Sequence, residues 1–511
     1  MDEATHNAQG AGGAPIPAGA AGRERLLWIG LLAFVAAWGF LFSLIQPLGG
    51  PGDEDAHIRY VRFLADEGRL PEWRAEGGGE AGYESQHPPL YYAAAALVYS
   101  LTGPLPEHWR WYALRWLSLA LGIALFAVAR AFALDYFHDR FRPAFAATAA
   151  FMLMPTTLLH ISYVNVDLAS VLWCSIVLWM AVRVARGEAS PRDRVALAAA
   201  FGLGLLTKLT ALGMLPAVVL AYVWDPRVAA GKEREQRLVR AALTLLGAAA
   251  IAGWWYARNS WLYGTPFTHT TGRYGSGLLL TQVTGRGLQF LAVTLRETYL
   301  STWAQRSWLP TWFVAPLYAP LTAILALAAV GGVIGCRARG RGDRPFDPAP
   351  WICGVTILVL FLGHQAQVWL VDYEFNAGGR YLLNGMLGAC ALIVAGLEKL
   401  RWQRVWPAVL VGLLVLADLV AAVRIVTVLN PRHYPDWRPL GPRQAAHCPR
   451  SRPAAAVRLS CCMLSRAARI ERGAERSVEG LGPAPRARWA SGARPKPRGQ
   501  LCPRRSRAEP F

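Results

Sequence analysis

Four ionisable side chains stand close together directly after the first long apolar segment of the chain. Asp53, Glu54, Asp55 and His57 occur in the stretch GGPGDEDAHIRYVRFLADEG, which follows the apolar window 26–47. Carboxylates at the head of a helix suit the helix dipole, and this explains Glu54 and Asp55. Asp53 and His57 are four residues apart, so they share one helix face beside the membrane. A carboxylate held there can act as a general base.

A second polar cluster, YESQHPPLYY, closes the same loop. Its prolines and tyrosines are typical of an apolar helix that starts at a membrane interface. That explanation does not account for Glu84 and His87 in the same stretch. Together with Asp53 and His57 they could act as a base or hold a divalent cation. The spacing by itself does not favour the metal site.

Cationic side chains also lie beside apolar segments. Arg258 and Arg380 are next to aromatic residues at predicted membrane faces, and Lys208 is flanked by apolar residues on both sides. Such groups can meet a charged phosphate, although an arginine can also simply extend from a helix end. Asp167 either lines a cavity or caps a helix.

Other charged residues have simpler explanations. Arg59 and Arg62 can pair with Asp66 or Glu67 on one helix. His364 and Asp418 are lone polar residues in apolar segments. We expect both to be packing residues with satisfied hydrogen-bond partners.

The elements that position these residues are predicted to be membrane-spanning helices. Of the 511 residues 54% are hydrophobic and 17% charged, against roughly 25% charged in ordinary soluble domains. Residues 26–45 alone would span about 30 Å as a helix, enough to cross a bilayer. The fold class is therefore all-α and polytopic, with about 10–12 spans and a helical first outer loop. The apolar windows are 26–47, 90–103, 116–134, 143–159, 168–182, 195–224, 241–257, 308–336, 349–371, 381–397 and 405–423.

Positive loops orient these spans. The arginine-rich loops 183–194 and 225–240 are predicted to be cytoplasmic, since positive charge marks that side. The residues between them must then form a hairpin of two short helices with Lys208 near its apex. Loops 48–89, 258–307 and 372–380 fall outside. One conflict remains. Each span takes the chain to the other side of the membrane, and a full span at 90–103 would place loop 183–194 on the wrong side. Either 90–103 is re-entrant, or the break at 160–167 is not a true loop.

The chain ends differ from the middle. Residues 1–25 are predicted to be a disordered cytoplasmic tail, 26–425 the transmembrane catalytic domain, and 426–511 a basic tail rich in Arg, Pro and Ala. Residues 441–511 carry +12 of the net charge of +20. This placement argues against nucleic acid as a partner, since the remainder lies mainly in short loops. The tail is either a disordered lipid-binding segment or the product of a shifted reading frame, and we favour the second.

The order of several motifs resembles the GT-C superfamily of integral-membrane glycosyltransferases, which includes protein mannosyltransferases and aminoarabinose transferases. The motifs are PGDEDAH, ESQHPPLYY, HISYVNVD, GLGLLTKLTALGMLP, WWYARNSWLYGTPF and GGRYLLN, within residues 26–425. The resemblance implies that Asp53 is the catalytic base, with Glu54 as its companion. Some members of the family bind a divalent cation near the start of the second span, which by position implicates Glu84 and His87 as ligands. Asn384 replaces the proline that usually follows RYLL in the family.

The expected activity follows from this resemblance. A hexosyl or pentosyl group would move from a polyprenyl-phosphate donor to an acceptor glycan, lipid or protein, with inversion, at the outer face of the inner membrane. Membrane lipids are the other expected partner. His57, Lys208, Arg258, Arg380 and Asp167 are the candidates for binding the substrate or lipid phosphate. Two alternatives stay open: a flippase for lipid-linked sugars, which would use intramembrane charges, and a catalytically silent scaffold.

Overall fold

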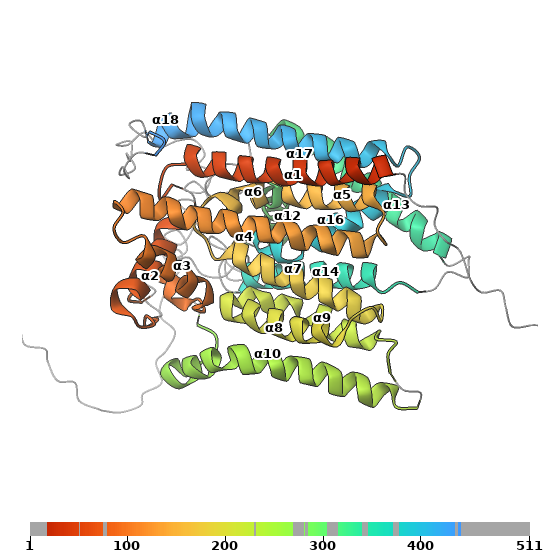
Figure 1. Cartoon of the computed structure of the whole chain (residues 1–511), viewed down its shortest axis with the longest axis horizontal. Helices are drawn as coiled ribbons and strands as arrows, with labels where there is room; N and C mark the ends of the chain where they lie inside the picture. Colours follow the sequence, from red (N-terminus) through yellow and green to blue (C-terminus); the bar gives the residue numbers. More distant parts are fainter. Residues whose placement is uncertain are drawn as a thin grey trace, which may run out of the picture. The chain divides into compact units, whose positions relative to one another are not determined.

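The computed structural model describes residues 18–50, 52–74, 79–228, 231–268, 281, 285–303, 315–339, 346–370, 378–434 and 438–440. Every regular element in these residues is helical, as Figure 1 shows. Eight helices are long and apolar enough to cross a membrane. The prediction of an all-α polytopic membrane protein is therefore confirmed. The eight are α1 (Ala18–Ile45), α4 (Glu107–Tyr136), α7 (Asp167–Ala185), α10 (Glu233–Tyr263), α13 (Ala315–Arg339), α14 (Ala349–Leu370), α16 (Leu383–Leu397) with the short η4 (Gly379–Leu382) before it, and α17 (Val405–Arg424).

A bent pair of helices gives a ninth span when the two are taken as one crossing. α5 (Phe141–Met152) and α6 (Pro155–Ser162) meet at an angle of 60°. Pro155 is the first residue of α6, and Met154 before it is extended. Proline has no N–H to continue α5, and it disfavours a helical conformation in the residue before it.

The predicted hairpin with Lys208 at its apex is confirmed. α8 (Pro191–Thr207) starts at a capping box, in which Ser190 and Asp193 bond each other's backbone N–H groups. Lys208 is extended and ends α8, and the chain returns through η2 (Leu209–Met214) and α9 (Leu215–Val223). By length and composition the described residues contain eight spans, or nine with the bent pair, and this hairpin of shorter helices comes in addition.

The first loop folds into a helical cap at one end of the molecule. It contains α2 (Glu54–Glu67), η1 (Tyr83–Gln86) and the start of α3 (Leu90–Leu101). We call the end of the molecule that carries this cap the α2 end. α3 has only 12 residues and lies at the α2 end with α2 (Figure 1), so it does not cross to the other side. This resolves the conflict in the predicted topology in favour of a short helix at 90–103.

The helical core extends beyond the predicted boundaries of the catalytic domain. α1 begins at Ala18, before residue 26. Beyond α17 the helix continues through the π-helix η5 (Ile425–Leu429) and α18 (Asn430–His433), past residue 425. Residues 441–511 lie outside the described residues, so the two interpretations of the basic tail stay predictions.

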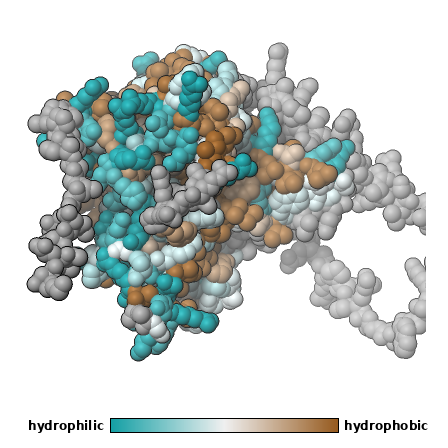
Figure 2. All heavy atoms as spheres, turned by 90° about the vertical axis from the view of Figure 1, so that its right-hand side faces the viewer, coloured by the Kyte–Doolittle hydropathy of each residue, from teal (hydrophilic) through white to brown (hydrophobic). Residues whose placement is uncertain are grey.

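Ion pairs tie the helices together at the opposite end, where the arginine-rich loops lie. Asp225 is fully buried and accepts from Arg194 at 2.8 Å and Arg240 at 2.9 Å. Arg186 pairs with Asp347 at 2.9 Å. Figure 2 looks onto this end and shows hydrophilic residues interspersed with hydrophobic ones. These contacts explain where much of the loop charge goes: it joins helices rather than forming one uniform basic surface.

Candidate active site

Asp53 starts α2 but does not cap it with its side chain. Its backbone carbonyl accepts from the N–H groups of Ala56 at 2.9 Å and His57 at 3.0 Å, which begins the helix. The carboxylate points elsewhere. Oδ1 accepts a hydrogen bond from the Tyr83 hydroxyl at 2.8 Å, and Oδ2 accepts one from Arg380 at 3.0 Å.

These contacts keep Asp53 ionised and accessible. Burial opposes its ionisation, but Arg380, His57 and the hydrogen bond from Tyr83 outweigh burial and the repulsion from Glu84, so the pKa of Asp53 is lowered. About a third of the side chain, 32%, stays exposed. The carboxylate is thus a charged acceptor that another molecule can reach.

Two glycines hold Arg380 beside Asp53. Gly378 and Gly379 precede it, and the Gly379 N–H donates to the Ser301 hydroxyl of α12 (Gly287–Trp303) at 2.6 Å. A Cβ at residue 379 would collide with the Thr298 carbonyl and with Thr302 of the same helix. The close approach of α12 therefore requires glycine at this position, and it sets the place from which Arg380 reaches Asp53.

A second ion pair lies next to the first. Lys208 at the hairpin apex donates to Asp167, the first residue of α7, at 2.6 Å, and both side chains are nearly buried. The ring of Tyr381 joins the two pairs, since its centroid is 5.5 Å from Lys208 Nζ and 5.4 Å from Arg380 Cζ. Asp167 is not needed as a cap, because Asn165 Oδ1 accepts the Leu168 N–H at 2.9 Å.

The predicted base-or-metal cluster forms a hydrogen-bonded chain. His57 Nδ1 is 2.9 Å from the Tyr92 hydroxyl, which donates to Glu84 Oε2 at 3.1 Å. His87 Nε2 is 3.0 Å from the same oxygen. Burial would raise the pKa of Glu84, but the two imidazoles and the hydrogen bond from His87 lower it to about 2. Burial lowers the pKa of His57 despite the nearby carboxylates.

This chain does not fit a metal site. His87 and Tyr92 both direct a hydrogen-bonding group at Glu84 Oε2, which leaves that oxygen occupied by the protein itself. Within the described residues no group of three or more His, Cys, Asp or Glu side chains is arranged to hold a metal ion. The predicted metal ligands Glu84 and His87 therefore serve as hydrogen-bond partners here, and no step below passes through a metal.

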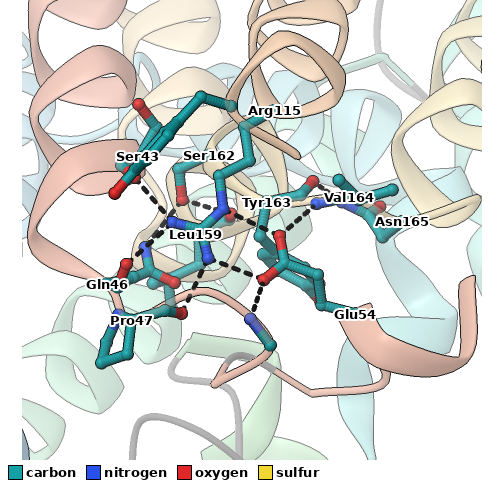
Figure 3. A network of polar contacts seen from close by, with 12 residues as sticks. Ser43, Gln46, Pro47, Glu54, Arg115, Leu159, Ser162, Tyr163, Val164 and Asn165 are labelled. Atoms are coloured by element: carbon teal, nitrogen blue, oxygen red, sulfur yellow. Dashed lines mark hydrogen bonds and ion pairs between the residues drawn. The ribbon is translucent and has the colours of Figure 1, made fainter. Parts of the chain in front are cut away.

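Glu54 belongs to a different network from Asp53, and Figure 3 shows the network of Glu54. Its side chain is completely buried and forms two hydrogen bonds with Arg115 of α4, at 2.8 and 2.6 Å. Its oxygens also accept from the backbone N–H groups of Gly49 at 2.8 Å and Val164 at 3.1 Å. Arg115 uses its other donors on carbonyls at the end of α1. Those carbonyls belong to Ser43, Gln46 and Pro47.

The predicted catalytic pair is thus divided in space. Asp53 faces the accessible side with Tyr83 and Arg380, while Glu54 faces the protein interior. The four hydrogen bonds to the Glu54 carboxylate come from the protein itself, and no part of its side chain is exposed. Glu54 therefore fits a structural role, holding the start of α2 against α4 and the loop before α7.

Arg258 lies apart from the two ion pairs. It is half-buried on α10, with its guanidinium 5.2 Å from the Trp255 ring and 6.0 Å from the Tyr263 ring. Within the described residues its one side-chain hydrogen bond is to the neighbouring Asn259 at 3.4 Å. The structure brings together Asp53, Arg380, Lys208 and Asp167, but it leaves Arg258 outside that group.

Three further expectations need correction. Arg62 pairs across to Glu107 of α4 at 3.6 Å, rather than with Asp66 or Glu67 of its own helix. Both carboxyl oxygens of Asp418 are buried without a hydrogen-bond partner in the described part of the chain, so the prediction of satisfied partners was wrong. His364 Nε2 has Thr298 as a partner, whereas His364 Nδ1 has none among the residues that the structure describes.

Sequence reasoning missed two residues of the site and one that supports it. Tyr83 stood in a quoted motif without a role, and Tyr381 follows Arg380 directly. Arg115, the supporting residue, directly precedes the apolar window 116–134, and the next charge is at residue 130. A lone arginine at the start of a span indicates a buried partner. Its partner Glu54 is 61 residues away in the chain, and nothing local identifies it.

Comparison with known proteins supports the resemblance. Residues 86–255, one third of the chain, match the family model for dolichyl-phosphate-mannose-protein mannosyltransferase. This match confirms the resemblance to GT-C glycosyltransferases. No curated protein matches the chain significantly.

Solved structures that match the chain include two proteins of low sequence identity. ArnT from Cupriavidus metallidurans, bound to undecaprenyl phosphate, is 19% identical with a TM-score of 0.46; the match covers 73% of this chain and 60% of ArnT. The Archaeoglobus fulgidus oligosaccharyltransferase, in complex with Zn and sulfate, is 12% identical with a TM-score of 0.49. That match covers 78% of this chain and 53% of the transferase, so the chain spans about half to three fifths of these proteins.

Proposed function

We propose that this GT-C-like membrane protein is an inverting glycosyltransferase, which moves a sugar from a polyprenyl-phosphate donor to an acceptor hydroxyl. The observation that carries the proposal is the Asp53 carboxylate, charged, accessible and held by Tyr83 and Arg380 beside a second cation, Lys208. The name of the matching family, a lipid-phosphate-mannose-dependent transferase, supports a donor of this class.

Asp53 is the base of the proposed reaction. The acceptor hydroxyl approaches the exposed part of the carboxylate and hydrogen-bonds to it. As the hydroxyl oxygen forms its bond to the anomeric carbon, its proton passes to Asp53. The bond between the anomeric carbon and the phosphate oxygen breaks on the opposite side of the sugar, which inverts the anomeric centre. Holding the two reactants in line supplies a large part of the rate.

Lys208 and Arg380 stabilise the departing lipid phosphate. Lysine has three N–H donors, and within the described residues Lys208 uses one on Asp167; arginine has five, and Arg380 uses one there on Asp53. Donors thus remain for the negative charge that develops on the phosphate. The buried Asp167 keeps the Lys208 ammonium in place while no substrate is bound.

The site is proposed to face the outer side of the inner membrane. It lies at the α2 end, opposite the loops that hold the arginines of 183–194 and 225–240. Short loops rich in arginine stay in the cytoplasm. The acceptor is accordingly a glycan, lipid or protein on the far side.

The test replaces Asp53 with asparagine. Purified protein in lipid nanodiscs is assayed with a panel of polyprenyl-phosphate sugars and hydroxyl acceptors. We expect Asp53→Asn to lower sugar transfer by roughly 10²- to 10⁴-fold, the usual contribution of a general base.

Asp66→Asn is the matched control, since Asp66 is exposed on the same helix. It should transfer sugar at the wild-type rate. Transfer by Asp53→Asn at the rate of the control would remove Asp53 from the base role. A wild-type protein inactive on the whole panel would instead favour the silent scaffold.

A further inference from the structure

A groove lies at the opposite end of the molecule from Asp53. It has a volume of about 530 Å³ and is formed by the first turns of α1, the last turns of α4 and the start of α5. This volume falls within the range of about 300–1,000 Å³ that small ligands occupy. Asp53 stands in the loop after Ile45, the last residue of α1, whereas the groove lies beside the first turns of α1. The length of α1 therefore separates the groove from Asp53.

The floor of the groove is apolar and aromatic. Trp28 packs edge-on against Phe126 at 6.2 Å and Phe141 at 5.8 Å, measured between ring centroids. Leu32 and Leu134 extend this surface along the helices. In a membrane-spanning bundle such a surface faces hydrocarbon, so the groove can receive a lipid chain.

Four charged residues line the same groove: Arg25, Arg130, Glu24 and Asp139. Within the described residues none of the four side chains has an ion pair or a hydrogen bond. Arg130 instead makes a cation–π contact with Trp28, with its guanidinium 5.2 Å from the ring centroid. By contrast Arg140, which directly follows Asp139 in the chain, is paired with Glu398 at 2.7 Å.

The unpaired charges indicate what would complement them. Two guanidinium groups suit a phosphate, which accepts hydrogen bonds from both. Two carboxylates suit a primary ammonium group. An anionic headgroup would meet the arginines but would also face Glu24 and Asp139 without compensation, and inorganic phosphate would leave the apolar floor uncovered.

We propose that the groove is a binding site for a phospholipid with a phosphate and a primary ammonium in its headgroup, that is, phosphatidylethanolamine. The phosphate lies against Arg25 and Arg130, the ammonium against Glu24 and Asp139, and an acyl chain covers Trp28 and Leu32. This site does not depend on the proposed transferase activity.

Site-specific photocrosslinking tests the proposal on the full-length protein. Ile29 lines the groove and is exposed, so a photoreactive p-benzoyl-phenylalanine is placed there. The same residue at Leu243, an exposed position of α10 outside the groove, reports the bulk bilayer. The protein is irradiated in nanodiscs of equal parts phosphatidylethanolamine and phosphatidylglycerol, and intact-mass spectrometry identifies the attached lipid.

We expect phosphatidylethanolamine to exceed phosphatidylglycerol at Ile29, with equal labelling at Leu243. The excess should fall roughly fivefold for each favourable charge contact removed. Arg25→Gln with Arg130→Gln removes the phosphate partners, and Glu24→Gln with Asp139→Asn removes the ammonium partners. Arg142→Gln, a nearby arginine that does not line the groove, is the control and should leave the excess unchanged.

Several results would overturn the proposal. The two lipids could label Ile29 and Leu243 in the same ratio, or phosphatidylglycerol could dominate at Ile29. Another such result is that lipid labels Leu243 but not Ile29, which would mean that something else fills the groove. Equal excess in the wild type and in both double variants would show that the four charges do not select the lipid. Labelling at Leu243 confirms in each variant that the protein is inserted.

Discussion

At the scale of single residues, the state of Asp53 depends on two hydrogen bonds. Tyr83 and Arg380 each donate to one carboxylate oxygen, and both favour the charged form that a base requires. Burial works in the other direction. A carboxylate oxygen can accept more than one hydrogen bond, so neither donor has to leave for an acceptor hydroxyl to approach.

Removing the Tyr83 hydroxyl should therefore shift the pH dependence of transfer. Tyr83→Phe deletes a hydrogen bond that lowers the pKa of Asp53, so the pKa rises. Asp53 is then protonated at higher pH, and the acid limb of the kcat/KM profile should move to higher pH. The measurement is the initial rate of sugar transfer across the acidic range.

Tyr99→Phe is the control for this change. The Tyr99 hydroxyl also donates to a carboxylate, Glu107, at 2.9 Å, but outside the site. The acid limb of the kcat/KM profile of Tyr99→Phe should coincide with that of the wild type. Coinciding limbs for Tyr83→Phe and the wild type would show that the hydroxyl does not act on the base.

At the scale of elements, one buried ion pair joins four segments. Glu54 at the start of α2 and Arg115 of α4 bond each other. Arg115 also bonds carbonyls at the end of α1, and Glu54 accepts from the N–H of Val164 before α7. The guanidinium of Arg115 and both oxygens of Glu54 have their hydrogen bonds satisfied by protein, which is the condition under which a buried ion pair is tolerated. Through the chain it places Asp53, one residue before Glu54, and Asp167, three residues after Val164.

Breaking the pair from one side should be costly. Glu54→Gln or Arg115→Met leaves a buried charge without its partner, and we expect each to lower the free energy of unfolding by about 3–5 kcal/mol. Glu54→Met combined with Arg115→Met should cost less than the two single losses added together, because it leaves no unpaired charge. Denaturant unfolding in detergent measures these losses.

A second ion pair between the same two helices serves as the control. Arg62 and Glu107 also connect α2 and α4, but both are about half exposed, at 51% and 47%. Arg62→Met should cost no more than about 1 kcal/mol. Equal losses for Arg62→Met and Arg115→Met would contradict the role given to the buried pair.

At the scale of the whole molecule, two ends have different chemistry. The α2 end gathers the carboxylates, imidazoles and cations of the site, and the opposite end joins its helices through paired loop charges. α7 lies in the centre, with 78% of its apolar window buried, and carries Asp167 at its first turn. α10 and α13 are peripheral, with 22% buried.

Labelling from each side of the membrane tests the orientation. In a variant with Cys336 and the four cysteines of 441–511 replaced by serine, Arg74→Cys marks the α2 end and Lys232→Cys the opposite end. Cys174, Cys353 and Cys390 are buried and stay in place. A membrane-impermeant maleimide should label residue 74 on intact cells, and residue 232 only after permeabilisation. The reverse pattern would place the site in the cytoplasm.

Local features of the sequence predicted much of the architecture. The lengths of the apolar windows predicted the spans, and the acids of residues 53–55 predicted that a helix begins there. The arginines on both sides of 195–224 predicted a hairpin with Lys208 at its turn. Each of these depends on residues close together in the chain, since a span requires only enough apolar length and a helix start only its own first turn.

The choice of partners was decided by the tertiary structure alone. Asp53 meets an arginine 327 residues further along the chain, and Glu54 meets one 61 residues away. Asp53 and Glu54 are adjacent in sequence and both acidic, yet successive helix-start residues point in different directions, and the packing of α4 and α12 determines what each encounters. The sequence by itself thus determined that charged residues gather beside the membrane. Only the packed helices decided which carboxylate is accessible and which is sealed inside, because that depends on surfaces far apart in the chain.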